Sequence, residues 1–237
     1  MEEQLAVVTG ASSGIGAELS RRLCRMGWRV IGAARSADKL NALREELGEC
    51  FTPLTVDLAD PSSLERITAA VEEHGGRLGL LVNNAGYAIA KPLHMHTPRE
   101  LEDIFLVDAI RPIQLTIRLL EYMPRGSTIV NVITAGVHVR MRSLPSYGAA
   151  KIALMYASMM LREELEEKGI HLIEVYPGPV KTRFFERAGM KTPKWASTPE
   201  KVAEEIIKAI EKRKKTVYIP APLAILRPLS TPLPIYF

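Results

Sequence analysis

Short apolar runs alternate with longer stretches of helix-forming residues along almost the whole chain. The apolar runs occupy residues 5–9, 29–33, 51–56, 78–82, 127–133, 170–176 and 216–219. Such runs are typical of strands buried on both faces, and the long helical connections between them predict repeated β-α-β units. Right-handed crossovers make a doubly wound parallel sheet the expected topology. The sequence therefore predicts a single α/β domain over residues 1–237, with about seven strands and helices on both faces of the sheet.

Helix-forming stretches fill the gaps between these strands. We expect helices from the first glycine run to about residue 26 and at 38–47, 61–73, 98–123, 147–168 and 199–212. The stretch 98–123 contains Arg111-Pro112, and proline removes a backbone donor and clashes with the preceding turn. An interruption is therefore expected near Arg111-Pro112.

Loops of unusual composition follow five of the predicted strands. They are residues 10–16, 57–58, 83–86, 134–136 and 177–182. Because the carboxyl ends of parallel strands meet at one edge of a sheet, these loops are expected to gather there and form the functional site.

Composition and charge exclude several classes of protein. Among 237 residues, 47% are hydrophobic and the formal net charge is only +4, which does not indicate a nucleic-acid binder. The dense basic run at 212–215 ends a predicted helix, where cations are favoured as a solvated cap. Cys24 and Cys50 have no metal-ligand or redox-motif spacing, and two free thiols predict a reducing, cytoplasmic location. No signal peptide or transmembrane segment is expected.

The tail at 220–237 is apolar but rich in proline. Its prolines prevent a continuous spanning helix: Pro220, Pro222, Pro228, Pro232 and Pro234. Packing on a neighbouring subunit or over the active-site mouth is favoured over contact with a membrane surface, because exposed apolar segments usually mark contacts.

The glycines at 10, 14 and 16 lie between a predicted strand and a predicted helix. Glycine permits positive φ and close backbone approach, and a helix N-terminus offers unpaired N–H groups to an anion. This context predicts a nucleotide phosphate site. No acid lies between Val30 and Ala37, and Arg35 follows the second strand, where a basic side chain accommodates a 2′-phosphate. We therefore favour NADP(H) over NAD(H) as the cofactor.

Tyr147 and Lys151 are four residues apart in a predicted helix and so share one face. A positive charge beside a phenol favours the phenolate and lowers a pKa that starts near ~10. Such a tyrosine can act as a general acid or base.

Four motifs together resemble the short-chain dehydrogenase/reductase family, whose fold is Rossmann-like. They are Thr9-Gly-Ala-Ser-Ser-Gly-Ile-Gly16, Asn83-Asn-Ala-Gly86, Tyr147-x-x-x-Lys151 and Pro177-Gly-Pro-Val-Lys-Thr182. The resemblance covers residues 5–219 and implies hydride transfer between a nicotinamide and a carbonyl or alcohol carbon, with Tyr147 as the acid/base. It also implies that Lys151 holds the nicotinamide ribose and lowers the Tyr147 pKa, and that the protein is a homodimer or homotetramer.

The same resemblance implies a set of cofactor-binding residues. These are Gly10, Ser12, Ser13, Gly14, Ile15, Gly16, Arg35, Asp57, Leu58, Asn83, Ala85, Gly86, Tyr147, Lys151, Pro177, Gly178, Val180 and Thr182.

Two positions depart from the family pattern. Thr134 lies thirteen residues before Tyr147, where the family usually has a serine that hydrogen-bonds the substrate oxygen. Asp108 replaces an asparagine whose backbone carbonyl is thought to hold a water linked to the lysine. A carboxylate there could also pair with Lys151 and weaken its effect on Tyr147. We carry both residues forward as candidate catalytic residues.

The substrate pocket is expected between Thr134, Tyr147, the loop 88–96 and the segment 182–195. The segment 183–197 is taken as the substrate loop, and its apolar residues with those before Tyr147 favour an apolar small molecule: Met141, Leu144, Phe184, Phe185 and Met190. His94 and His96 lack further ligands at a convincing spacing, so no metal is expected. Two alternatives remain: a nucleotide-binding regulator of the same fold that has lost turnover, and a basic module for nucleic-acid or membrane surfaces.

Overall fold

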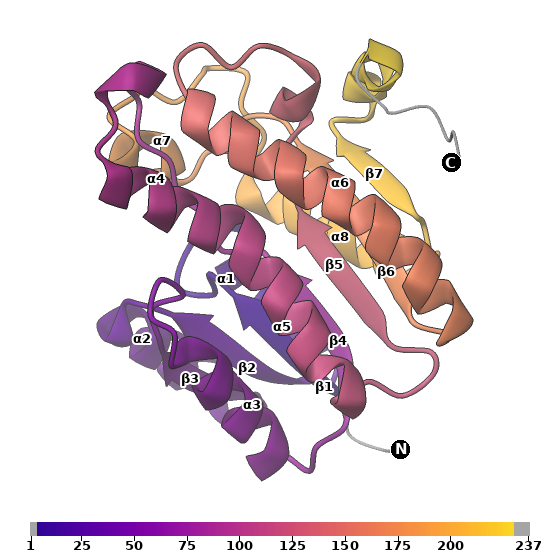
Figure 1. Ribbon diagram of the computed structural model, residues 1–237. Coiled ribbons are helices and arrows are strands. Elements are labelled where there is room, and N and C mark those ends of the chain that lie inside the picture. The colour runs from indigo at the N-terminus through magenta and orange to yellow at the C-terminus, as the bar shows by residue number, and fades with distance from the viewer. Residues whose placement is uncertain (1–3, 230–237) are drawn as a thin grey trace.

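The strands and their order define the architecture. The computed structural model describes residues 4–229. Its strands are β1 (Leu5–Thr9), β2 (Arg29–Ala34), β3 (Phe51–Thr55), β4 (Leu78–Asn83), β5 (Thr128–Val132), β6 (His171–Pro177) and β7 (Thr216–Ile219). All are parallel and lie in the order β3-β2-β1-β4-β5-β6-β7. The predicted doubly wound sheet is confirmed, and its strand order reverses between β1 and β4 (Figure 1).

Helices cover both faces of the sheet. They are α1 (Gly14–Arg25), α2 (Ala37–Leu47), α3 (Ser63–Glu73), α4 (Pro98–Phe105), α5 (Arg111–Leu119), α6 (Pro145–Glu167), α7 (Arg183–Arg187) and α8 (Pro199–Glu211). Short helical turns are η1 (Gly48–Cys50), η2 (Leu93–Met95), η3 (Leu106–Ile110), η4 (Leu120–Tyr122), η5 (Ala135–His138) and η6 (Ala221–Leu229). Side chains of α1, α2 and α8 form one core layer, whereas those of α3, α5 and α6 form the other.

The strands form where the sequence is apolar because both faces of the sheet are covered. Every residue of β1 and of β5 is buried. Among parallel strands, this burial pattern follows from helices packed on both sides. The carboxyl ends of the strands therefore remain the part of the sheet where loops can form a site.

The long helix before β5 is interrupted directly before Arg111-Pro112, as the sequence predicts. A π-helical turn, η3, separates α4 from α5, and Pro112 occupies the second position of α5. The proline ring clashes with the carbonyl four residues earlier, at Asp108, so a wider turn accommodates it. The turn carries Asp108 toward α6 and buries its side chain.

The prediction of two free thiols is wrong. Cys24, at the end of α1, and Cys50, at the end of η1, form a disulfide with their Cα atoms 5.6 Å apart. They are separated by 26 residues, and the bond links the end of α1 to the turn before β3.

The C-terminal part of the structure and its helices bear on the predictions about membranes and the tail. No helix within residues 4–229 has both the length and the apolar character of a membrane span. The tail forms the helical turn η6 over its first part. Its last eight residues, 230–237, with Pro232 and Pro234, lie outside the described residues.

Candidate active site

A cavity of about 1050 Å³ opens at the carboxyl ends of the strands. Each of the five loops that the sequence singles out contributes to its wall. The predicted residues that line it are Gly10, Ser12, Ser13, Gly14, Ile15, Arg35, Asp57, Leu58, Ala85, Gly86, Thr134, Tyr147, Lys151, Pro177, Gly178, Val180 and Thr182. Three predicted site residues do not line the cavity: Gly16, Asn83 and Asp108. They contact residues that do, or lie beneath them.

The glycine turn lies between β1 and α1 and leaves room only for backbone. Gly10 has φ +69° and its N–H donates to the Ala33 carbonyl at 2.8 Å. A Cβ at Gly16 would overlap the carbonyl oxygen of Gly10 and lie 2.7 Å from Asn84 Nδ2. The Ser13 side chain makes no capping bond and the first turn of α1 holds no acid, so its N–H groups face the cavity without a side-chain acceptor. This cradle has the backbone and the polarity that a dinucleotide phosphate requires.

Asn83 is the last residue of β4 and Asn84 the first of the loop after it, and their side chains have different surroundings. Asn83 is buried, and its Nδ2 donates to Asn131 Oδ1 at 2.8 Å, inside the protein rather than in the cavity. Asn84 lines the cavity, and its Nδ2 donates to the Thr9 carbonyl at 2.9 Å. Thr9 Oγ1 also accepts the backbone N–H of Asn84 at 3.0 Å. Asn84, which the sequence analysis did not select, therefore ties the glycine turn to the end of β4.

Arg35 lies at the other end of this part of the cavity, after β2. Its guanidinium is 3.9 Å from Asp57 Oδ2 and 6.0 Å from the centre of the Tyr87 ring. The Arg35 side chain is 60% exposed, so it can turn toward an anion at little desolvation cost.

Tyr147, Lys151 and Asp108 form a buried cluster next to the cavity. Lys151 Nζ lies 3.3 Å from Asp108 Oδ1 and donates to the Val132 carbonyl at 3.1 Å. It is 5.8 Å from the centre of the Tyr147 ring. Asp108 Oδ2 accepts the Tyr87 N–H at 3.2 Å, and a Cβ at Gly86 would overlap Asp108 Oδ1. The Asp108 carboxylate is therefore fixed on three sides, and it pairs with Lys151 as the sequence allowed.

The pKa values in this cluster differ from the expectation for a tyrosine beside a lysine. Burial raises the pKa of Asp108 to about 6, against the opposing effect of Lys151. Burial and then the Asp108 carboxylate raise the pKa of Tyr147 above its ordinary value. The expected lowering of the Tyr147 pKa is thus reversed here, because Asp108 takes up the charge of Lys151 and the phenol is desolvated.

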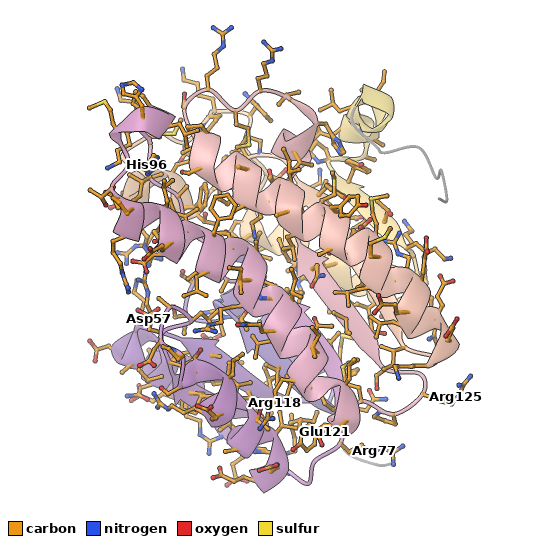
Figure 2. All side chains as sticks on the ribbon, viewed as in Figure 1. Asp57, Arg77, His96, Arg118, Glu121 and Arg125 are labelled. Atoms are coloured by element: carbon orange, nitrogen blue, oxygen red, sulfur yellow. A yellow bond between two sulfur atoms is a disulfide. The ribbon has the colours of Figure 1, made fainter. Side chains whose placement is uncertain are left out.

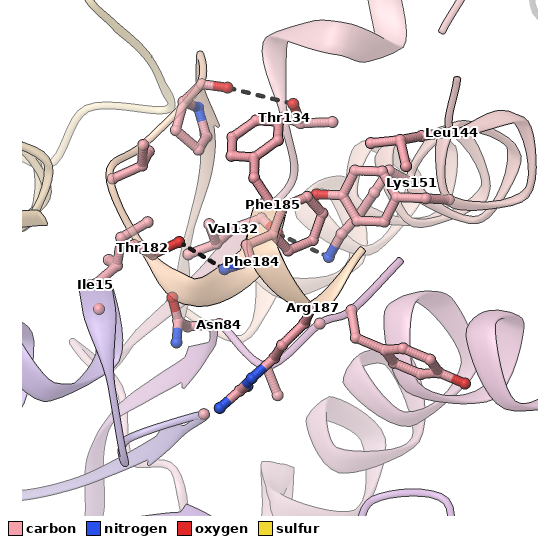
Figure 3. Close-up of a pocket in the computed structure, with 18 of the residues that line it drawn as sticks. Ile15, Asn84, Val132, Thr134, Leu144, Lys151, Thr182, Phe184, Phe185 and Arg187 are labelled. Carbon is pink, nitrogen blue, oxygen red and sulfur yellow. Dashed lines mark hydrogen bonds between the residues drawn. The ribbon is translucent and has the colours of Figure 1, made fainter. Parts of the chain in front are cut away.

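Thr134 lies where β5 ends and caps η5. Its Oγ1 accepts the Gly136 N–H at 3.1 Å and donates to the Pro177 carbonyl at 3.3 Å (Figure 3). The hydroxyl is half-buried and lines the cavity. It joins the end of β5 to the loop after β6.

The loop after β6 lies against the start of α1. A Cβ at Gly14 would come within 2.7 Å of Thr182 Cγ2, and Thr182 Oγ1 accepts the Phe184 N–H at 3.2 Å at the start of α7. The N–H of Gly178 donates to the Ile219 carbonyl at 2.8 Å. Pro177 to Thr182 therefore connects the cofactor-side cradle with α7.

The wall of the cavity near Tyr147 contains the apolar residues that the sequence singles out. All five predicted apolar residues line it: Met141, Leu144, Phe184, Phe185 and Met190. The Tyr147 and Phe184 rings are 5.1 Å apart, and the Ala90 N–H donates to the Ala188 carbonyl at 3.1 Å. That bond joins the loop 88–96 to α7, although the loop itself does not line the cavity. His96 Nε2 pairs with Ser146 Oγ at 3.2 Å.

Several lining residues lie in segments that the sequence predicts near the site, although the sequence does not single out the residues themselves. Trp195, Leu223 and Leu226 come from segments far apart in the chain that meet at the cavity. Arg187 extends from α7 to the Asn84 side of the cavity, away from Thr134 and Leu144 (Figure 3). Arg187 and Trp195 belong to the predicted substrate loop 183–197, and Leu223 and Leu226 to the tail that was expected to pack on a neighbouring subunit or over the active-site mouth.

Comparisons with known proteins agree with this geometry. A sequence profile described as short chain dehydrogenase matches residues 4–192. Serine 3-dehydrogenase of Agrobacterium fabrum is 31% identical over 180 residues, covering 75% of this chain and 72% of that protein.

Two solved structures share the fold. A short-chain dehydrogenase from Sphingobium yanoikuyae in complex with NADPH has a TM-score of 0.83 and 25% identity, covering 92% of this chain and 88% of that one. A short chain dehydrogenase/reductase from Burkholderia phymatum in complex with NAD has a TM-score of 0.86 and 19% identity, and 98% of each chain is covered. On the profile match and the shared sheet, the chain belongs to the short-chain dehydrogenase family.

Proposed function

We propose that the protein is an NADP(H)-dependent oxidoreductase that interconverts a carbonyl group and a secondary alcohol, with Tyr147 as the general acid and base. One observation carries this proposal. Tyr147, Lys151 and Thr134 line the same cavity as the glycine turn, so a proton donor and a dinucleotide cradle face one space.

The residues around the cavity fit a nicotinamide dinucleotide. The glycine turn and the start of α1 would hold the pyrophosphate, Lys151 the nicotinamide ribose, and Pro177 to Thr182 the nicotinamide end. The bound cofactor supplies or accepts the hydride, and the protein contributes position and electrostatics. The Sphingobium and Burkholderia proteins carry NADPH and NAD respectively, so the preference proposed for this chain rests on Arg35.

Arg35 favours the phosphorylated cofactor for an electrostatic reason. A planar guanidinium can donate two parallel hydrogen bonds to a 2′-phosphate, and no carboxylate follows β2 to bind ribose hydroxyls instead. Asp57, its nearest acid, is half-exposed and lies 3.9 Å away. The weak pair leaves Arg35 free to exchange Asp57 for a phosphate.

The protonated phenol of Tyr147 can serve as the proton donor in carbonyl reduction. A phenol whose pKa lies above its ordinary value keeps its proton at neutral pH and can give it to a carbonyl oxygen. Thr134 would donate a second hydrogen bond to that oxygen in place of its bond to the Pro177 carbonyl. Two donors stabilise the negative charge that develops on the oxygen.

We also propose that the protein forms homodimers or homotetramers through α5 and α6. Four apolar side chains on these two helices are exposed, and they lie on neighbouring surfaces: Ile117, Ile152, Tyr156 and Met160. Exposed apolar patches of this kind usually mark an interface.

The cytoplasmic location stays a prediction. The disulfide between Cys24 and Cys50 removes the argument for it that came from two free thiols.

Absorbance of NADPH tests the proposal directly. Purified protein mixed with NADPH and a panel of ketones is expected to consume the cofactor, whereas binding of NADPH with no consumption on any ketone supports the regulator instead.

Arg35→Ala tests the cofactor preference. The ratio of kcat/KM for NADPH to that for NADH is expected to fall at least about tenfold, equivalent to ~1.4 kcal/mol. Arg66→Ala, an exposed arginine on α3 outside the cavity, is the matched control and leaves the ratio unchanged. An unchanged ratio in Arg35→Ala would remove that side chain from the cofactor site.

A further inference from the structure

The substrate end of the cavity combines an apolar wall with a basic rim. Its apolar wall comes from Met141, Leu144, Phe184, Met190, Trp195 and Leu223. Its rim is the segment between η5 and α6, which carries Arg140 and Arg142 on either side of Met141.

The local backbone keeps the two arginines together at this rim. The Arg142 N–H donates to the Arg140 carbonyl at 3.0 Å, and the Leu144 N–H to the Met141 carbonyl at 3.0 Å. Met141 turns inward, since a Cβ at Gly136 would come within 2.5 Å of its sulfur. Both arginine side chains are exposed at the mouth of the cavity.

The charges of the cavity do not balance at this end. Its two acids, Asp57 and Asp103, each face an arginine, Arg35 at 3.9 Å and Arg99 at 3.1 Å. Among the described residues, Arg140 and Arg142 take part in none of the ion pairs that the structure contains. Within residues 4–229, the rim therefore holds two positive charges that form no ion pair with a carboxylate.

The phosphates of a dinucleotide have other arginines nearby. Arg183 and Arg187 lie on α7 and line the cavity, and both contribute, after burial, to a lowered pKa of Lys39 on α2. They therefore face the cofactor side of the cavity. The rim segment precedes α6 and lies at the top of Figure 1, whereas α2 lies in the lower half, at the left.

We infer that the substrate is an anionic amphiphile: a carbonyl or alcohol on an apolar chain that ends in a carboxylate or phosphate. The inference rests on the proposed function. The apolar chain lies along Leu144, Phe184 and Met190, which brings the reacting carbon to Tyr147. The anionic end pairs with Arg140 and Arg142, where charge-assisted hydrogen bonds fix its position.

A matched pair of substrates tests this charge recognition. The probes are 10-oxoundecanoate and its methyl ester, which share the chain and the ketone and differ in charge. In the wild-type protein kcat/KM is expected to be at least about tenfold higher for the acid. In the variant Arg140→Gln/Arg142→Gln this preference is lost through a higher KM for the acid, with kcat and the ester kinetics unchanged.

The control variant removes two arginines far from the cavity. Arg25 ends α1, which begins at the cavity and runs away from it, and Arg125 lies at the far end of the molecule (Figure 2). Arg25→Gln/Arg125→Gln is expected to keep the preference for the acid. Equal kinetics for acid and ester in the wild-type protein, or an equal loss for both in the rim variant, would overturn the inference.

Calorimetric titration separates this inference from the proposed function. Dodecanoate and dodecanol, which cannot be reduced, are titrated into the protein without cofactor. Tighter binding of dodecanoate that vanishes in Arg140→Gln/Arg142→Gln supports the inference even if no ketone is turned over. Equal affinity for dodecanoate and dodecanol would contradict the inference. So would binding of the protein to anionic phosphatidylglycerol vesicles through Arg140 and Arg142 with no preference for dodecanoate over dodecanol.

Discussion

At the scale of single residues, the Asp108 carboxylate sets the electrostatics of the candidate catalytic group. It pairs with Lys151 at 3.3 Å and raises the pKa of Tyr147, after the larger effect of burial. A lysine that is paired with a carboxylate favours the phenolate less than a free one does. The chain therefore departs from a simple tyrosine and lysine pair at one side chain.

Asp108→Asn tests this influence. Removing the carboxylate makes ionisation of the phenol easier, so the pKa of Tyr147 falls. In alcohol oxidation the phenolate is the base, so kcat rises with pH as Tyr147 loses its proton. This rise is expected to lie at lower pH in Asp108→Asn than in the wild-type protein. Carbonyl reduction at neutral pH is expected to stay within about tenfold, or ~1.4 kcal/mol.

The same pH profile is expected to show a second change, at lower pH, that comes from Asp108 itself. Burial raises the pKa of Asp108 to about 6, so its carboxylate takes up a proton as the pH falls from about 7 to 5. The kcat of the wild-type protein is expected to change over this range, and that change is expected to be absent in Asp108→Asn. A thousandfold loss of turnover would show that the carboxylate itself is needed. A rise of kcat at the same pH in Asp108→Asn and in the wild-type protein would contradict the electrostatic account.

At the scale of elements, the glycine turn and α1 form one rigid unit. Gly16 is packed against the Gly10 carbonyl and the Asn84 amide, which is itself bonded to Thr9. The shape of the cradle thus depends on contacts among β1, α1 and the end of β4.

Gly16→Ala tests that dependence. The added methyl group overlaps backbone, so the variant is expected to lose about 1–3 kcal/mol of unfolding free energy and to bind NADPH at least about tenfold more weakly. Chemical denaturation and fluorescence titration of NADPH measure the two effects. Gly148→Ala is the control, because its Cβ would make only ordinary contacts, 3.6 Å or longer, with Met141. Unchanged NADPH binding in Gly16→Ala would show that the cradle does not hold the cofactor.

The elements could be predicted from the sequence where local pattern decides them. The strands are apolar because both faces are covered, and the loops after β1, β4 and β6 carry glycine, asparagine or proline that force their turns. The interruption before Pro112 was predicted, but its π-helical form, which buries Asp108 beside Lys151, was not. The burial of Asn83 was missed for a related reason, since its partner Asn131 lies on another strand.

At the scale of the whole molecule, distant segments meet in ways that spacing does not reveal. Cys24 and Cys50, 26 residues apart, form a disulfide that links the end of α1 to the turn before β3. The wall of the substrate end joins Trp195, Leu223 and the segment before α6, which are far apart in sequence. Such meetings are set by the sheet order, so the sequence predicts which segments approach the cavity but not which of their residues line it.

The exposed apolar surface of α5 and α6 yields a prediction about assembly. The wild-type protein is expected to be a dimer or tetramer in light scattering after size-exclusion chromatography. Ile117→Glu/Tyr156→Glu places charges on side chains that are 58% and 53% exposed, so it is expected to give folded monomers. A wild-type protein that is monomeric at micromolar concentration would refute the proposed interface.

The measurement that tests the central proposal most directly is the turnover and NADPH affinity of Tyr147→Phe. The variant keeps the ring that packs on Phe184 and loses only the hydroxyl. We predict that kcat for ketone reduction falls by about 10²–10⁴-fold, the contribution of a positioned general acid, while the Kd for NADPH changes less than about threefold. A Tyr147→Phe variant that reduces ketones at the wild-type rate would contradict the account.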